Sequence, residues 1–412
     1  MQGGRMKKSE KFFISAWNRS AFNKTPEEKI ADWHDLGLTV AMAHFTEADK
    51  PKVHRLLDLA AERDMMLILG DERAYWKNLT KNGEEKYRAD MAAAIEEFGS
   101  HPATFGFYIG DEPDAPDFDD AMMATRINNE MAPHLTAYLN LLPWFSWIGK
   151  RMGTKEYGPY LDRVVKEGNC TLVSYDCYTQ MYEGKTGYDV YFNNLREHYL
   201  SSKRNRVPFI NIVLSSGHFD YRCPSKDDMW WQLNTSVAHG AKGISWFLID
   251  MDIIHHNYRN LPINQLGERT EQFGWLSEVN RIFHKYCGKV INTLTIDKCF
   301  HVCEAYGGMP LFEPFGNLLG VESRGDIPLI VSDFYNDKGE HFYMICNNTP
   351  EKSANVSIRV KAGVKLTRCN IDNTFIEIPA LADPIGAQFN TPGQSYNFFL
   401  SPGQLALLKE NF

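Results

Sequence analysis

One apolar stretch of the chain ends in three carboxylates. Residues 105–110 are mostly aromatic and aliphatic, and Asp111, Glu112, Pro113 and Asp114 follow directly. Such a run is typical of a strand buried on both faces, and carboxylates at its end are costly to desolvate unless they are paired or used. The chemistry open to such a group is general acid–base catalysis, in which a positioned carboxyl group gives its proton to a leaving oxygen. We predict that Glu112 is a catalytic acid.

Two later apolar runs also end in a carboxylate that could work with Glu112. Asp176 follows residues 171–175, and Asp250 follows residues 243–249. We predict that Asp176 is the second catalytic carboxylate, with Asp250 as the alternative. Each has an ordinary structural competitor, because carboxylates after strands also orient neighbouring side chains or simply face water.

Aromatic and polar side chains near the ends of the strand-like runs could contact a substrate. Aromatic rings offer flat apolar faces that stack on sugars, and carboxylates, histidine and arginine hydrogen-bond to hydroxyl groups. The predicted substrate contacts are Trp17, Asp71, Asp111, Trp144, Tyr175, Tyr178, His218, Arg222, Trp246 and Asp250. Core packing is the competing role of the tryptophans, and a salt bridge to Arg73 is that of Asp71. The combination of rings and carboxylates favours a carbohydrate substrate.

Asp111 bears on the protonation state of its neighbour Glu112. Burial and a nearby like charge both raise the pKa of a carboxyl group, as a general acid near neutral pH requires. Neighbours along an extended strand point to opposite faces. We therefore expect only one of these two side chains to face the site directly.

The elements that must position these residues alternate between strand and helix. Residues 12–17 and 38–45 are strand-like, and the helix between them begins with Thr25 as its cap, Pro26 at the first helical position and Glu28 completing a capping box. Eight strands with intervening helices fit a (β/α)8 barrel over residues 11–288. A doubly wound open sheet competes, but the Gly-x-Gly-x-x-Gly fingerprint after the first strand is missing.

The pattern changes to short alternating strands after a closing helix at about residues 270–286. Residues 329–334, 341–346 and 356–360 have the period of half-buried strands and are separated by turn residues. We predict a β-sandwich domain over residues 289–412. Residues 396–405 are expected to form a final hairpin.

Composition restricts the partners. The net charge of −8 argues against nucleic acid or an anionic membrane as the main partner, and no apolar run reaches transmembrane length. The eight cysteines form no Cys-x-x-Cys pair and the histidines show no metal-ligand spacing, so we expect no metal and no cofactor. Residues 1–11 lack a signal-peptide core. The protein is expected in the periplasm or outside the cell if a signal was removed, and in the cytoplasm otherwise.

The segment Tyr108-Ile109-Gly110-Asp111-Glu112-Pro113 resembles the strand-four motif of clan A (β/α)8 glycoside hydrolases, in which proline often follows a catalytic acid/base glutamate. The Gly-Asp-Glu-Pro form resembles a set of bacterial glycosidases related to the β-galactosidase-like barrels. Residues 174–176, 221–224 and 238–244 resemble the same set. The resemblance covers most of residues 11–290 and implies hydrolysis of glycosidic bonds in an oligo- or polysaccharide, with Glu112 as acid.

One position departs from that family. Clan A enzymes carry a nucleophilic glutamate at the end of strand seven, where this chain reads Ser215-Ser216-Gly217-His218 with no carboxylate before Asp220. The alternatives that follow are a second carboxylate elsewhere, a carbohydrate-binding or catalytically inactive barrel, or a lyase acting on a sugar or sugar acid. The sugar, the linkage, the stereochemical course and the oligomeric state stay open.

Overall fold

The computed structural model describes residues 11–18, 23–251, 254–382 and 393–411. Residues 1–10 of the N-terminal segment considered for a signal peptide lie outside these ranges. Asp252, which follows the eighth strand-like run, also lies outside them. The chain separates into two compact units. The first contains Phe13–Cys223 and Ala241–Asn280, and the second contains Pro224–Gly240 and Arg281–Phe412. The boundary expected at residue 288 places residues 224–240 in the barrel, whereas the structure groups them with the second unit.

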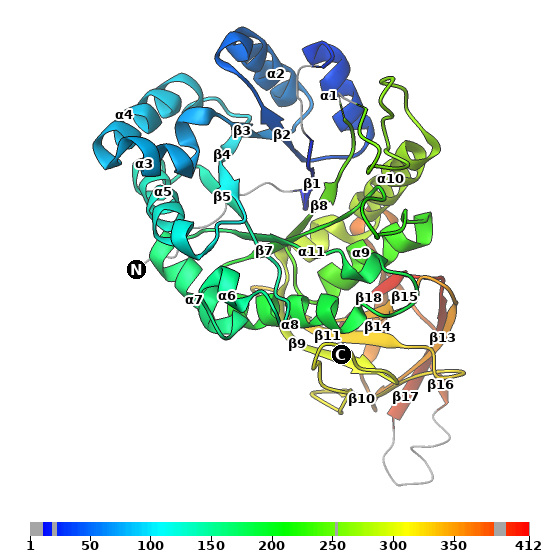
Figure 1. Cartoon of the computed structure of the whole chain (residues 1–412). Helices are drawn as coiled ribbons and strands as arrows, with labels where there is room; N and C mark the ends of the chain where they lie inside the picture. Colours follow the sequence, from blue (N-terminus) through cyan, green and yellow to red (C-terminus); the bar gives the residue numbers. More distant parts are fainter. Residues whose placement is uncertain (1–10, 19–22, 252–253, 383–392, 412) are drawn as a thin grey trace. The chain divides into compact units, whose positions relative to one another are not determined.

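The first unit is built on one parallel sheet whose order is β1-β8-β7-β6-β5-β4-β3-β2. The backbone N–H of Thr39 donates to the carbonyl of Ile14 at 2.9 Å, which brings the two ends of the sheet together. The expected (β/α)8 barrel is thereby confirmed, and Figure 1 shows its strands as a ring. The strands are β1 (Phe13–Ala16), β2 (Val40–His44), β3 (Met66–Gly70), β4 (Thr104–Asp111), β5 (Thr136–Leu141), β6 (Val173–Asp176), β7 (Phe209–Leu214) and β8 (Gly243–Phe247).

Helices follow the strands and lie outside the ring (Figure 1). The first begins as expected, because the Thr25 hydroxyl accepts from the Glu28 N–H and the Glu28 carboxylate accepts from the Thr25 N–H. The helices of this unit are α1 (Pro26–Asp35), α2 (Lys50–Glu62), α3 (Trp76–Asn82), α4 (Glu84–Ala94), α5 (Phe118–Met131), α6 (Gly149–Met152), α7 (Tyr157–Gly168), α8 (Tyr188–Asn205) and most of α10 (Glu271–Phe283). Among the described residues, no helix combines the length and the apolar character needed to cross a membrane.

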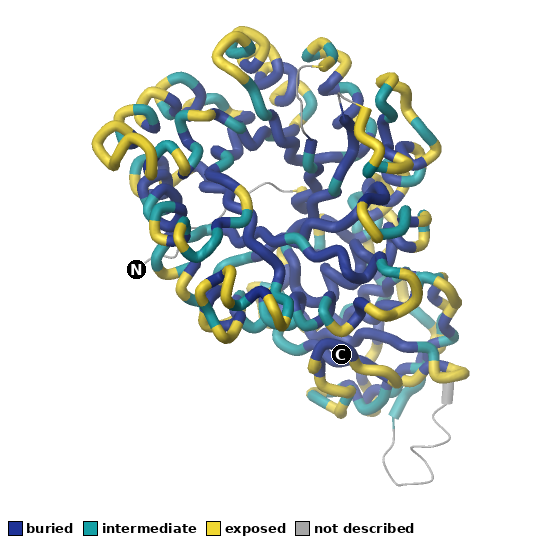
Figure 2. The backbone as a smooth tube through the Cα atoms, viewed as in Figure 1, coloured by how far each residue is buried: buried dark blue, intermediate teal, exposed yellow. Residues whose placement is uncertain are grey.

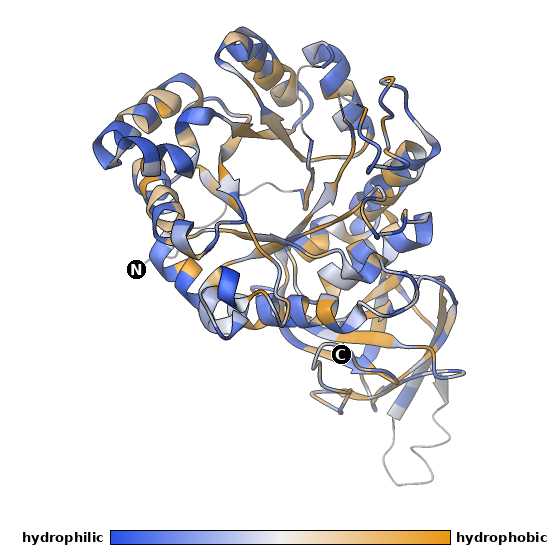
Figure 3. Cartoon of the chain, in the orientation of Figure 1, coloured by the Kyte–Doolittle hydropathy of each residue, from blue (hydrophilic) through white to orange (hydrophobic). Residues whose placement is uncertain are grey.

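The interior of the barrel is packed with side chains from successive strands. Phe13, Met42, Ile68, Phe105 and Ile210 are among the members of this core, and each is at most 2% exposed. Figure 2 shows the strands buried and the outer faces of the helices exposed, and Figure 3 shows much of the same strands as hydrophobic. Because these side chains fill the barrel interior, a site can form only at the carboxyl ends of the strands.

The second unit contains two antiparallel sheets and the helices α9 (Lys226–Ala238) and α11 (Lys289–Thr293). One sheet has the order β10-β13-β17-β16 and the other β15-β14-β18-β12-β11-β9. The strands are β9 (Thr295–Val302), β10 (Leu318–Ser323), β11 (Leu329–Tyr335), β12 (His341–Asn347), β13 (Ala354–Lys361), β14 (Lys365–Asn370), β15 (Thr374–Glu377), β16 (Leu381–Ala382), β17 (Gly393–Leu400) and β18 (Leu405–Asn411).

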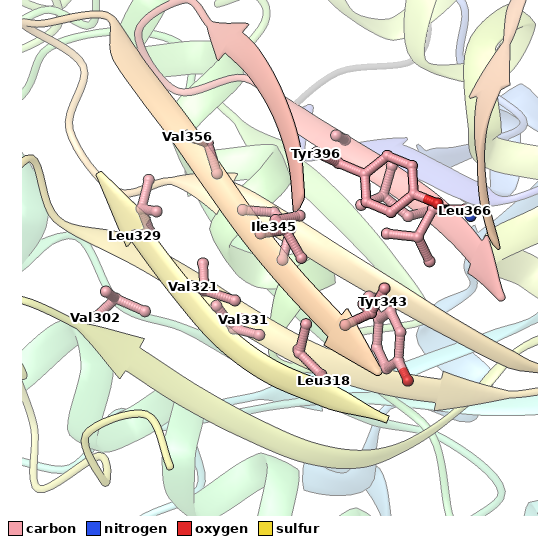
Figure 4. Packing of buried hydrophobic residues seen from close by; sticks show 14 of the residues in the cluster. Val302, Leu318, Val321, Leu329, Val331, Tyr343, Ile345, Val356, Leu366 and Tyr396 are labelled. Carbon is pink, nitrogen blue, oxygen red and sulfur yellow. Dashed lines mark hydrogen bonds between the residues drawn. The ribbon is translucent and has the colours of Figure 1, made fainter. Parts of the chain in front are cut away.

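Apolar side chains from both of these sheets share one core, shown close up in Figure 4, as a β-sandwich requires. Val321 and Val356 come from one sheet, and Val331 and Ile345 come from the other. The expected hairpin over residues 396–405 is wrong. β17 pairs with β13 and β16, whereas β18 pairs with β12 and β14, so the turn between them crosses from one sheet to the other.

Candidate active site

A cavity of about 740 Å³ opens at the carboxyl ends of the barrel strands. Its lining includes residues from the ends of β2, β4, β5, β6 and β8 and from the loops that follow β5 and β7. This is the face at which (β/α)8 barrels carry their active sites, and the volume lies within the range of about 300 to 1,000 Å³ common for small-molecule sites. The residues predicted from the sequence can therefore be placed relative to one cavity.

The end of β4 turns both Asp111 and Glu112 into this cavity. The pairing register with β5 shifts between Tyr108 and Gly110, as a bulge does, and Glu112 adopts a φ of 45°. The left-handed backbone at Glu112 breaks the alternation of an extended strand, so the expectation that only one of the two acids faces the site is wrong. Residues held in this region of φ/ψ space cost roughly 1 to 3 kcal/mol and cluster at functional sites.

Three carboxylates meet in the cavity. The carboxyl groups of Glu112 and Asp176 lie close enough for each to shift the pKa of the other. The Asn140 side-chain amide donates to Asp176 Oδ1 at 2.8 Å and to Asp111 Oδ1 at 3.0 Å, and its own oxygen accepts from the Ser174 hydroxyl at 3.1 Å. Because one amide nitrogen serves two carboxylates, the acids at the ends of β4 and β6 are held as a single cluster.

Burial and neighbouring carboxylates raise the pKa of Glu112 and Asp176. Burial, followed by the charge of Asp111, raises the pKa of Glu112 from 4.5 to about 7, although the Arg151 guanidinium opposes the rise. Burial and the neighbouring Glu112 raise the pKa of Asp176 well above its ordinary value. Arg151 lies with Nη2 3.9 Å from Glu112 Oε2, and its Nε donates to Asp114 Oδ1 at 2.5 Å. Two neighbouring carboxyl groups cannot both ionise cheaply, so the rise in pKa belongs to the pair.

Aromatic rings from the loops after β6 and β7 and from β8 also line the cavity. Tyr178 stacks on Phe247 with centroids 5.5 Å apart, and His218 contacts both rings, at 5.5 and 5.1 Å. Tyr221 meets Tyr178 edge to face at 5.8 Å. Burial lowers the pKa of His218 to about 4, so its imidazole is neutral near pH 7. We call Tyr178, His218, Tyr221 and Phe247 the aromatic wall.

Further lining residues come from the ends of β1 and β2 and from the loop after β5. Trp17 contacts His44, whose pKa burial lowers to about 4. At the rim, Phe145 and Trp147 stack at 5.3 Å, and Trp147 is 71% exposed. A stacked pair of rings whose tryptophan is exposed at the edge of a cavity is suited to contact a ligand that extends out of it.

Half of the predicted site residues meet at the cavity. The residues that line it are Trp17, Asp111, Glu112, Asp176, Tyr178 and His218. Sequence reasoning missed Phe145, Trp147, Arg151, Phe219 and Phe247. The aromatic cluster after β5 was a usable signal for two of them, since residues 144–147 read Trp-Phe-Ser-Trp.

The other predicted contacts lie outside the cavity lining, which corrects their sequence-based placement. Tyr175 is fully buried and stacks on His198 at 3.7 Å, and Trp246 is fully buried and donates its indole N–H to Asn280. Both lie one residue before a cavity residue, Asp176 or Phe247. Because strand residues alternate between the two faces, an error of one position exchanges the barrel interior for the helix-facing side.

The polar members of this set have structural partners. Asp250 forms a buried ion pair with Lys29, and Asp71 is bound at both oxygens by Arg73. Trp144 stacks on Tyr157 at 5.9 Å. Arg222 lies beyond the β7 loop and is likewise absent from the cavity lining.

Within the described ranges, no group of three or more histidine, cysteine or acidic side chains is arranged to hold a metal ion. The arrangement can hold a protonated carboxyl group beside two further carboxylates in a cavity that aromatic rings also line. Such a site can donate a proton to an oxygen atom of a bound polyol.

Comparisons with known proteins agree on the fold. No family model and no curated protein matches the sequence. Among solved structures, the chain is similar to a family 5 glycoside hydrolase from Bacteroides vulgatus, with 11% identity, a TM-score of 0.58, and coverage of 100% of this chain and 92% of that one. A second structure, described as a glycoside hydrolase, gives 10% identity, a TM-score of 0.56 and coverage of 99% and 96%.

The likeness extends to larger proteins. A β-galactosidase from the haloarchaeon Halorubrum lacusprofundi gives 12% identity and a TM-score of 0.50 over 66% of this chain. The chain covers 58% of that enzyme and 59% of a β-galactosidase from Marinomonas ef1. At these identities the likeness shows the fold, a (β/α)8 barrel with further β-sheets, which this chain shares with solved glycoside hydrolases.

Proposed function

We propose that the protein is a glycoside hydrolase that cleaves glycosidic bonds of an oligo- or polysaccharide, with Glu112 as the general acid. The observation that carries the proposal is the raised pKa of Glu112, about 7, in a cavity at the carboxyl ends of the barrel strands. A glycosidic oxygen leaves readily only when it is protonated as its bond to C1 breaks. A carboxyl group with an ordinary pKa would be ionised at neutral pH and could not supply that proton.

The chain's own residues divide the work. Glu112 is the proposed proton donor, and burial and the charge of Asp111 raise its pKa. The Asn140 amide donates to one oxygen of Asp176 and to one of Asp111, which holds these two carboxylates at the cavity. Trp17 and the aromatic wall supply the flat apolar faces on which sugar rings stack. Asp176 is the second carboxylate of the proposed site.

The test is release of reducing ends from a panel of oligo- and polysaccharides by the wild-type protein and by Glu112→Gln. We expect the variant to lose turnover by at least about 1,000-fold, because an amide cannot donate the proton, while it keeps the fold and binds the same oligosaccharide. Unchanged circular dichroism and calorimetric binding establish the last two points. Hydrolysis by Glu112→Gln at the wild-type rate would show that Glu112 is not the acid.

A carbohydrate-binding barrel without catalysis is the second candidate. It is favoured by the end of β7, where the described residues 212–218 contain no carboxylate. In that case the wild type and Glu112→Gln bind the same oligosaccharide with equal affinity, and neither releases reducing ends from any member of the panel.

A further inference from the structure

Two large aromatic side chains at the mouth of the cavity are left in solvent. Trp147, on the loop after β5, is 71% exposed, and Phe219, on the loop after β7, is 67% exposed, yet both belong to the cavity lining. A single exposed ring is ordinary, but exposed apolar surface gathered at one cavity is typical of a place where a ligand binds. The mouth therefore offers binding surface beyond the interior of the cavity.

The loop after β7 holds Phe219 in an unusual backbone conformation. Its φ is 47°, which a bulky residue rarely adopts. Its N–H donates to Asn257 Oδ1 at 2.7 Å. The Arg259 guanidinium donates to the carbonyl oxygens of Phe219 and Tyr221, at 3.3 and 2.8 Å. Such strain persists only where the surroundings impose it, and it clusters at functional sites. A ring fixed in this way loses little conformational freedom when a ligand packs on it.

Trp147 is supported by a second ring. The rings of Phe145 and Trp147 are stacked, with centroids 5.3 Å apart and an angle of 16° between their planes. The Ile148 N–H donates to the Phe145 carbonyl at 3.1 Å, which closes a turn around Trp147. Both exposed rings are therefore positioned by contacts with the rest of the chain.

The two loops that carry these rings flank one of the proposed catalytic acids. In the sheet, β6 lies between β5 and β7. The loops after β5 and β7 therefore stand on either side of the end of β6, where Asp176 lies. A ligand that contacts both Trp147 and Phe219 must pass the end of this strand.

Each loop also makes contacts beside the acids. The loop after β5 contains α6, whose Arg151 has its Nη2 3.9 Å from Glu112 Oε2. In the loop after β7, the Phe219 ring contacts His218 at 5.1 Å. His218 in turn contacts Tyr178, which follows Asp176 by two residues, at 5.5 Å. The exposed rings are thus linked to the two sides of the acidic cluster.

We propose that one sugar chain lies across the mouth of the cavity, with Trp147 and Phe219 binding units on opposite sides of the bond that is cleaved, so that the protein cuts internal bonds of a polysaccharide. This inference rests on the proposed function and adds where the chain is cut. Removal of terminal units requires binding surface on one side of the bond only. Rings on both sides of the acids instead suit a chain that continues in both directions, because each ring offers a flat apolar face to one sugar unit.

The experiment compares the fall in viscosity with the release of reducing ends. The substrates are β-glucan, galactomannan and arabinoxylan, together with oligosaccharides of increasing length prepared from each. Every cut consumes one water molecule and gives one new reducing end. A cut inside a long chain greatly shortens it, so we expect viscosity to fall steeply while few reducing ends have formed, and the first products to be longer than disaccharides.

Variants of the two rings test their role. Trp147→Ala and Phe219→Ala should each lower kcat/KM on the accepted polysaccharide on the order of 10-fold, mainly through a higher KM, because each removes one ring contact with the chain. The loss should be smallest on the shortest oligosaccharide, and Trp147→Tyr should restore most of it. The control Phe399→Ala, which removes a ring that is 71% exposed on β17, should leave kcat/KM unchanged.

Each other outcome overturns a definite statement. Release of terminal units with a slow fall in viscosity overturns the cutting of internal bonds and leaves the proposed function standing. Equal kcat/KM in the wild type and both alanine variants of the rings overturns their role. If no member of the panel is cleaved, the proposed function itself fails. Calorimetric binding of the same oligosaccharides then decides the role of the rings, which an unchanged affinity in Trp147→Ala and Phe219→Ala overturns.

Discussion

The tripeptide Gly-Asp-Glu occurs at the ends of two adjacent barrel strands with opposite outcomes. After β3 it is Gly70-Asp71-Glu72, and Asp71 is buried and bound at both oxygens by Arg73. Arg73 also binds Glu97 at 2.7 Å. After β4 it is Gly110-Asp111-Glu112, and the two acids line the cavity with a third. The same three residues form a structural ion pair in one place and a candidate active site in the other.

Two local differences account for this. Arg73 stands two residues after Asp71, and a cation there pairs with it through a short helical turn that Asp71 caps. The corresponding position after Asp111 is Pro113, which carries no charge. Glu112 also has a positive φ, which Glu72 lacks. The comparison teaches that an acid at a strand end becomes chemically useful when no cation binds both of its oxygens and the backbone turns it toward the cavity.

The largest effect expected from this comparison is on turnover. Glu112→Gln should lower kcat/KM by at least about 1,000-fold, and Glu72→Gln should leave it within about twofold, since Glu72 is exposed and outside the cavity lining. Steady-state kinetics on one accepted glycoside measures both. Equal losses in the two variants would remove the distinction between the strand ends.

For stability we expect the reverse order: a substitution of the acid after β3 should matter more than a substitution of the acid at the end of β4. Asp71→Asn leaves the Arg73 guanidinium without its bidentate partner, and we expect it to lower the free energy of unfolding by about 2 kcal/mol. Asp111→Asn removes an exposed member of a repelling acidic cluster and should change stability by no more than about 0.5 kcal/mol. Urea denaturation of both variants checks this. A larger loss in Asp111→Asn than in Asp71→Asn would contradict the structural role given to the β3 acid.

The pH dependence of activity should shift in opposite directions in Asp111→Asn and Arg151→Gln. A general acid works only while protonated, so kcat/KM falls above the pKa of Glu112, which burial and Asp111 raise to about 7. Asp111→Asn should lower that pKa and move the basic limb of the profile to lower pH by roughly one unit. Arg151→Gln removes a charge that lowers the pKa, so the limb should move to higher pH by a smaller amount. Shifts in the same direction would mean that neither charge acts through Glu112.

The smallest effect expected is a pH-dependent gain in stability. The pKa of Glu112 is higher in the folded protein than its ordinary value of 4.5. Its contribution to stability is therefore fully present below about pH 4.5 and is lost as pH rises through about 7. Glu112→Gln cannot ionise, so above pH 7 it should be more stable than the wild type by about 1 kcal/mol. Thermal unfolding of Glu112→Gln and the wild type between pH 4 and 8 measures this difference, with Glu72→Gln as the control. A variant less stable than the wild type above pH 7 would contradict the prediction.

Much of the site was predictable from the strand ends, and the errors of one position within strands have one cause. Glu112 and Asp176 follow apolar runs directly, so order along the chain placed them at one end of the barrel. Trp246 was chosen over Phe247 because the run around it is apolar on both faces. A strand buried on both faces does not show in its sequence which residues point inward.

The sequence by itself determined the barrel, the sandwich and the carboxyl group at the end of β4, because hydrophobic period, capping residues and turn residues act locally. Only the tertiary structure decided which acids are neutralised. Asp250 and Lys29 are far apart in the chain yet form a buried ion pair, while Asp176 and Glu112 lie close enough for Glu112 to raise the pKa of Asp176. Pairing of charges depends on distance in space, which the order of residues along the chain does not give.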